Sequence, residues 1–200
     1  MQYTYWTIEA AAQAEFKDRG SKFLAYAYPV RTQEEIKEHL KTLKELHPKA
    51  VHHCYAWRLG VSGTLFRAND DGEPSGSAGR PILGQIDSAG VTNVLVVVVR
   101  YFGGTLLGVP GLINAYKTVA AAALQEVQRV ERDLEAVYDL EYEYPIMNQV
   151  LYTVKQHQAA ILKNDLMLFC STQISVPLKN EKACLEKLEQ IHGLKITRSA

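Results

Sequence analysis

Hydrophobic positions recur every three or four residues in several stretches of the chain, and this spacing predicts helices. One begins at a capping box on Thr32 and is stopped by His47-Pro48. A longer one covers residues 112–127 with its apolar residues on one face. A short helix with Pro81 in its first turn stands between them in the sequence.

Other stretches read as strands. Residues 23–30, 51–59 and 65–68 are rich in β-formers, and Gly60 to Gly63 predicts a hairpin turn. The run VTNVLVVVV at residues 91–99 is β-branched with almost no polar interruption. Such a run predicts a central strand that is covered on both faces.

The pattern changes near residue 132, where apolar and acidic residues begin to alternate up to Tyr144. We then expect a helix over 145–159, two strands flanking 163–165, a helix over 179–192 and a strand over 194–197. This β-α-β-β-α-β order is ferredoxin-like. The predicted fold class is therefore α+β with two domains, a mixed β-α domain over 1–130 and a ferredoxin-like domain over 131–200.

Charge argues against a generally basic nucleic-acid binder, because Lys+Arg and Asp+Glu are both 22. The balance is 14 basic to 12 acidic in residues 1–130 and 8 to 10 in residues 131–200. The start of the chain lacks a signal-peptide pattern, and the three cysteines form no CxxC pair. We expect a cytoplasmic protein in which any RNA contact is local.

The loop from Asp70 to Pro81 is the first candidate site. Gly76 and Gly79 permit close backbone approach, and the N-terminus of the following helix could meet an anion. A solvent-exposed turn fits the same residues. The loop's carboxylates, Asp70, Asp71 and Glu73, would repel a phosphate unless a cation or Arg80 intervened.

The second candidate is the glycine-rich connection from Arg100 to Gly111, which contains Gly103 and Gly104. It is neither a Walker A loop nor GxGxxG, so nucleotide hydrolysis and dinucleotide redox chemistry are not expected. Arg100, Tyr101 and Phe102 together suit single-stranded RNA or a protein hot spot. Alternatively, Phe102 packs in the core and Arg100 pairs with a carboxylate.

The third candidate is His52-His53-Cys54. In a strand, His52 and Cys54 share one face and His53 points to the other, so a shared metal would need distortion. We expect no cofactor and no resident metal. The alternative, a metal-dependent hydrolase, would gather His52 with the loop carboxylates Asp70, Asp71 and Glu73 around one ion.

Three sequence blocks resemble the IMPACT/YigZ family: HHCYAWR at residues 52–58, DDGEPSGSAG at 70–79 and GRPILGQIDSAGVTNVLVVVVRYFGGTLLG at 79–108. The resemblance implies an amino-terminal domain similar to the second domain of a ribosomal small-subunit protein. It also implies a carboxy-terminal domain similar to the ferredoxin-like domain of the translocating elongation factor.

Eukaryotic members of this family regulate translation during stress, by competing for the partner that activates a starvation-responsive initiation-factor kinase. The resemblance thus implies a translation-related binding protein that contacts RNA, the ribosome or a translation factor, rather than an enzyme. A proline-dipeptidase label carried by some bacterial members points to the hydrolase alternative. The residues expected to bind are Gly76, Gly79, Arg80, Arg100, Tyr101, Phe102, Gly103, Gly104 and Lys117.

Overall fold

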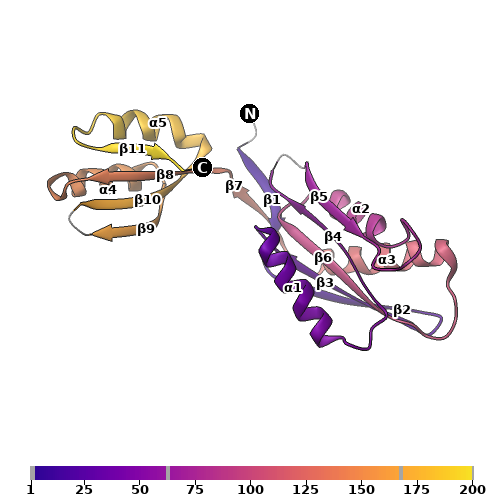
Figure 1. Ribbon diagram of the computed structural model, residues 1–200. Coiled ribbons are helices and arrows are strands. Elements are labelled where there is room, and N and C mark those ends of the chain that lie inside the picture. The colour runs from indigo at the N-terminus through magenta and orange to yellow at the C-terminus, as the bar shows by residue number, and fades with distance from the viewer. Residues whose placement is uncertain (1–2, 62–63, 167–168, 200) are drawn as a thin grey trace. The chain divides into compact units, whose positions relative to one another are not determined.

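The computed structural model describes residues 3–61, 64–166 and 169–199, and the chain forms two compact units (Figure 1). The N-terminal unit is Tyr5–Glu131. The C-terminal unit is built mainly from residues 132–200. Both units mix helices and sheet, which confirms the predicted α+β class with two domains. No helix among the described residues is long and apolar enough to cross a membrane.

The N-terminal unit is built on a five-stranded antiparallel sheet of order β2-β3-β6-β4-β5. The strands are β2 (Ala12–Asp18), β3 (Ser21–Pro29), β4 (His52–Leu59), β5 (Leu65–Asn69) and β6 (Val94–Tyr101). Every residue from Val94 to Val99 is fully buried, as expected for a central strand covered on both faces. Two strands near the N-terminus, β1 (Thr4–Ile8) and β2, were not predicted.

Helices cover both faces of this sheet (Figure 1). The alternate residues Val94, Val96 and Val98 pack in one core with α2 (Gly79–Ala89) and α3 (Gly108–Gln125). Their neighbours along β6 pack in the other core with α1 (Gln33–Leu46). The capping prediction is confirmed, since the Thr32 hydroxyl accepts the backbone N–H of Glu35.

The predicted helix over 112–127 is four residues longer at its start than expected, because α3 begins at Gly108. Val109 and Pro110 occupy the first turn, where a proline without an N–H is tolerated. The glycine-rich connection after β6 is correspondingly short. The predicted turn over residues 60–63 lies partly outside the described residues.

The C-terminal unit has the predicted β-α-β-β-α-β order, with antiparallel strands in the order β11-β8-β10-β9. Its elements are β8 (Glu135–Tyr142), α4 (Met147–Gln156), β9 (Ala160–Leu166), β10 (Cys170–Pro177), α5 (Leu178–Glu189) and β11 (Lys195–Arg198), with a short 3-10 turn at Tyr144–Ile146.

Two details of the prediction for this region are wrong. Residues 163–165 do not form a turn, because they lie within β9 and pair with β10. The single strand expected from residue 132 is two strands: β7 (Arg129–Asp133), which pairs with β1, and β8. Lysine, asparagine and aspartate resemble a turn in sequence, and only their pairing with residues 171–173 makes them a strand.

Candidate functional site

The loop between β5 and α2 folds around the carboxylate of Asp70. One of its oxygens accepts the backbone N–H groups of Ala78 and Gly79, at 3.1 and 2.8 Å, and the other accepts that of Gly76 at 2.9 Å. Burial alone would raise the pKa of Asp70, but these three hydrogen bonds and the charge of Arg80 lower it below the ordinary value. The chain's own carboxylate thus occupies the helix N-terminus where an external anion was expected.

Two of the predicted binding glycines are packed against the chain itself. A Cβ on Gly79 would lie 2.5 Å from the backbone nitrogen of Asn69. A Cβ on Gly103 would lie 1.9 Å from the carbonyl carbon of Gly20. Only glycine permits these approaches, which fix the loops that precede α2 and follow β6. The turn glycines 76 and 104 have positive φ angles, +77° and +86°.

Beneath these loops lies a buried ion pair between Glu73 and Arg100. Their side chains are 3% and 6% exposed, and Nη1 of Arg100 lies 2.6 Å from Oε1 of Glu73. The hydroxyl of Tyr116 on α3 donates to the same oxygen at 2.7 Å. Arg100 therefore pairs with a carboxylate, as one of the two alternatives expected, whereas Phe102, expected in the core by the same alternative, is 48% exposed.

Arg100 is also held between two aromatic rings, with its guanidinium carbon 5.4 Å from the centre of Phe23 and 5.6 Å from that of Phe102. Its Nη2 donates to the Ser21 hydroxyl at 3.4 Å, and that hydroxyl accepts the Gly103 N–H at 3.2 Å. Its Nε is buried without a hydrogen-bond partner among the described residues. The packing that fixes this side chain thus leaves one buried donor unpaired.

His52 borders the same cluster from β4. Its Nδ1 lies 2.8 Å from the carbonyl oxygen of Asp71, which can only accept, so Nδ1 carries the proton in the neutral ring. Its Nε2 then faces Glu73, at 3.8 Å from Oε1. His53 points to the opposite face as predicted, and burial lowers its pKa.

Cys54 is fully buried and donates to the carbonyl oxygen of Asp70 at 2.9 Å. Burial raises the pKa of this thiol strongly, which favours the protonated form over the nucleophilic thiolate. The carboxylates proposed for a metal are engaged separately: Asp70 at the α2 N-terminus, Asp71 on the His53 N–H and Glu73 on Arg100. Within the described residues, no group of three His, Cys, Asp or Glu side chains could hold an ion.

A cavity of about 410 Å³ opens above the ion pair. Its polar floor is formed by His52, Glu73 and Arg100. The remaining wall is apolar or glycine. It comes from the α1–β4, β5–α2 and β6–α3 connections and from the start of α3: Val51, Pro74, Phe102, Leu106, Leu107, Gly108, Val109 and Leu112. Four of its large hydrophobic side chains are well exposed, with Leu106 at 80%. The two candidate loops therefore converge on one pocket with an apolar rim.

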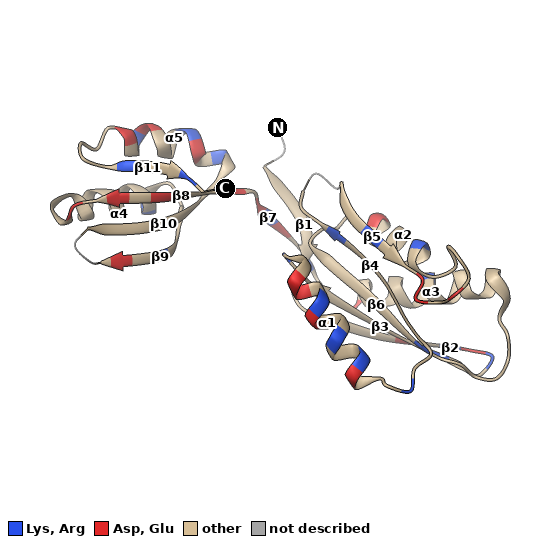
Figure 2. Ribbon diagram, in the orientation of Figure 1, with Lys and Arg blue, Asp and Glu red and all other residues tan. Residues whose placement is uncertain are grey.

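Of the nine predicted binding residues, Arg100 and Phe102 line this pocket; the four predicted glycines, and also Tyr101, Arg80 and Lys117, are not part of its lining. Tyr101 follows Arg100 in β6 and so points to the other face, where its hydroxyl lies 2.9 Å from Nδ1 of His47. Arg80 and Lys117 are exposed on α2 and α3, outside the pocket lining. Elsewhere in this unit, lysines and glutamates are interspersed along α1 (Figure 2).

Sequence reasoning missed Leu106, Val109 and the Tyr116 hydroxyl. Leu106 and Val109 looked like part of a glycine-rich turn, and only their exposure beside a cavity distinguishes them. Tyr116 fits the apolar face of α3 by its spacing. Its contact with Glu73 joins positions 43 residues apart, which no local pattern reports.

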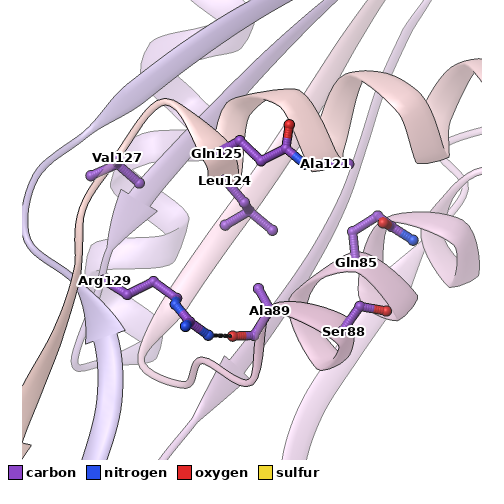
Figure 3. A pocket seen from close by; sticks show the side chains of 8 residues that line it. All are labelled: Gln85, Ser88, Ala89, Ala121, Leu124, Gln125, Val127 and Arg129. Atoms are coloured by element: carbon purple, nitrogen blue, oxygen red, sulfur yellow. Dashed lines mark hydrogen bonds between the residues drawn. The ribbon is translucent and has the colours of Figure 1, made fainter.

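A second cavity, of about 360 Å³, lies between the C-terminal ends of α2 and α3 (Figure 3). Arg129 reaches across it and donates to the carbonyl oxygen of Ala89 at 2.7 Å. Its guanidinium carbon lies 5.5 Å from the centre of a ring of Trp6. The hydrogen bond satisfies the last carbonyl of α2, and together with the Trp6 contact it gives Arg129 a structural role. The first cavity is therefore the better functional candidate.

Comparison with known proteins agrees with this fold. Residues 19–124 match the Impact N-terminal domain. The chain is 33% identical to IMPACT family member YvyE of Bacillus subtilis, covering 79% of this chain and 73% of that protein. It is 31% identical to IMPACT family member YigZ of Escherichia coli, covering 86% of each. A crystal structure described as that of a hypothetical protein superposes with a TM-score of 0.79 at 27% identity, covering 100% of this chain and 99% of that one.

Proposed function

This chain belongs to the IMPACT family, and we propose that it is a non-enzymatic protein that acts in the regulation of translation by holding a protein partner at the Glu73–Arg100 pocket. The translation-related role is the one that the family resemblance implies. The choice of a protein partner, rather than RNA, rests on the pocket itself.

The observation that best supports a protein partner is the exposed apolar rim of the pocket around its polar floor. Phe102 is 48%, Leu106 80% and Val109 45% exposed, and all three line one cavity with Val51. Clustered apolar side chains at the mouth of a pocket are typical of protein contacts, in which a buried anchor is surrounded by a rim that excludes water. The expected occupant is an apolar side chain of the partner, with a polar atom beside it facing His52.

The charge of the floor favours a protein over a phosphate backbone. RNA binding draws its affinity from unpaired Lys and Arg that displace counterions. Arg100 is already neutralised by Glu73 at 2.6 Å, and Asp70 fills the N-terminus of α2. A phosphate at this position would compete with two carboxylates, whereas an apolar side chain meets no such cost.

The test compares two exposed leucines in the full chain. Leu106→Asp places a charge on the pocket rim, and Leu46→Asp is the matched control at the end of α1, where the side chain is 62% exposed. Co-sedimentation with ribosomes and pull-down of purified translation factors are measured for each. We expect Leu106→Asp to weaken binding by at least about tenfold and Leu46→Asp to leave it unchanged.

The salt dependence of binding distinguishes a protein partner from RNA. Binding through the apolar rim should change little between low and moderate salt, whereas phosphate contacts lose affinity steeply. Binding that vanishes with added salt and ignores Leu106→Asp would mean that RNA contact elsewhere on the chain carries the interaction. Wild-type protein that binds neither ribosomes nor translation factors would remove the proposal.

A further inference from the structure

The C-terminal unit ends on one side with an exposed edge strand. β9 is the outer strand of the sheet order β11-β8-β10-β9, as Figure 1 also shows. All seven of its residues are exposed, among them Ile161 at 48%, Leu162 at 54% and Leu166 at 47%. An edge strand with apolar side chains is a template for pairing with another strand.

The sequence of β9 is complementary to itself when two copies run antiparallel. Centred on Asn164, such a pair places Lys163 opposite Asp165 of the second copy, and Asp165 opposite its Lys163. The next positions outward place Leu162 opposite Leu166, in both directions. Opposite charges and apolar side chains directly across an antiparallel pair are both stabilising.

The arrangement also agrees with the faces of the strand. Lys163 and Asp165 pair with Gln173 and Ser171 of β10, while Asn164 between them pairs with Thr172 and accepts its hydroxyl at 2.8 Å. The two charged residues therefore share one face of the sheet. A twofold axis through Asn164 keeps that face on the same side in both copies, so all the charge contacts would form together.

Edge strands are often protected by a lysine or a bulge. β9 has both, since Lys163 lies within it and its register with β10 shifts between Gln173 and Ile174. The shift leaves Leu162 as the extra residue of the bulge and residues 163–166 in regular register, so the charge contacts carry more of the pairing than the Leu162–Leu166 contacts. Within its own strand, Nζ of Lys163 lies 2.7 Å from Oδ2 of Asp165. Lys163 does not oppose pairing with an identical strand, because across the axis it meets a second carboxylate and the four side chains alternate in charge. It does oppose other registers and most foreign strands.

We propose that β9 is a self-association edge, through which two copies of this chain join their C-terminal sheets by antiparallel pairing centred on Asn164. The second copy is favoured as the occupant by the reciprocal charge pattern, which a strand of unrelated sequence would match only by chance. Self-association at this edge is independent of the pocket in the N-terminal unit, so each proposal can fail alone.

Charge reversal provides the test, using sedimentation equilibrium of the full chain. Asp165→Lys places like charges opposite each other at two symmetric points, as does Lys163→Asp. Each single variant should weaken the dimer by about tenfold or more. The double variant Lys163→Asp/Asp165→Lys restores opposite charges and should dimerise like wild type. An equimolar mixture of the two single variants should form a heterodimer.

Disulfide formation between two copies tests whether the twofold axis of the dimer passes next to position 164. Asn164→Cys brings two thiols together only if position 164 faces its own copy, and the three native cysteines are buried. Thr197→Cys on β11, the opposite edge, is the matched control. Rapid cross-linking at 164 but not at 197 is expected under mild oxidation. A monomeric wild type, an unaffected dimer in both single variants, or equal cross-linking at the two positions would overturn the proposal.

Discussion

The buried Glu73–Arg100 pair makes a quantitative prediction about the site. Arg100→Met keeps most of the apolar stem but leaves the Glu73 carboxylate, 3% exposed, with Tyr116 as its remaining donor at 2.7 Å. Removing one partner of a buried pair costs about 3–5 kcal/mol, because the other charge stays desolvated. The same reasoning applies to Glu73→Gln, which leaves Arg100 charged between two rings.

The double variant Glu73→Gln/Arg100→Met removes both charges, and the glutamine oxygen can still accept the Tyr116 hydroxyl. We therefore expect it to be more stable than Arg100→Met, with a coupling free energy of at least about 2 kcal/mol. Urea unfolding followed by tryptophan fluorescence measures this, since Trp6 and Trp57 both lie in the N-terminal unit. A loss of unfolding free energy below about 1 kcal/mol for Arg100→Met would refute the description of the pair as buried and coupled. So would a double variant whose loss equals the sum of the losses of the two single variants.

Three further predictions concern the supporting structure. Gly103→Ala should unfold or severely destabilise the N-terminal unit, because its Cβ would overlap Gly20. Gly84→Ala is the control in the interior of α2, where a Cβ meets no atom within 4 Å, and it should stabilise the unit by about 0.5–1 kcal/mol in the same urea titration. The lowered pKa of Asp70 means that its carboxylate stabilises the fold above its ordinary pKa of 3.8, and this stability is lost as the pH falls through the lower folded value. Asp70→Asn should therefore unfold more easily at pH 7 and show a flatter acid limb in a pH series. The three buried thiols should resist a thiol reagent at pH 8 in the native protein and react fully in urea. The extent of labelling is measured by absorbance, and fast labelling of the native protein would contradict the burial of the thiols.

Much of the fold could be predicted because its strongest signals are local. The β-branched run ending at Val99 and the capping box on Thr32 each determine one element and agree with the structure. The alternation from residue 132 predicts β8 but not the separate strand β7, which is defined by its pairing with β1. β2 was missed because only three of its four inward positions are apolar, and two of these three are alanines. A segment with such weak apolar alternation forms a strand only because β3 pairs with it.

The site could be predicted only in part. Arg100, Glu73 and His52 were chosen for their chemistry, and the structure brings all three to one pocket. Their roles depend on contacts between distant positions, such as Tyr116 with Glu73, which spacing does not reveal. Tyr101 was grouped with Arg100 because the two are adjacent, although alternation along β6 separates them.

The most direct test of the central claim is photo-crosslinking from the pocket rim. A photoreactive amino acid at position 106 of the full chain, with position 46 as the control, reports what lies within a few ångströms of each side chain. We predict that position 106 cross-links to a protein of the translation apparatus and that position 46 does not. Cross-links from position 106 to RNA alone, or equal products from both positions, would contradict the account.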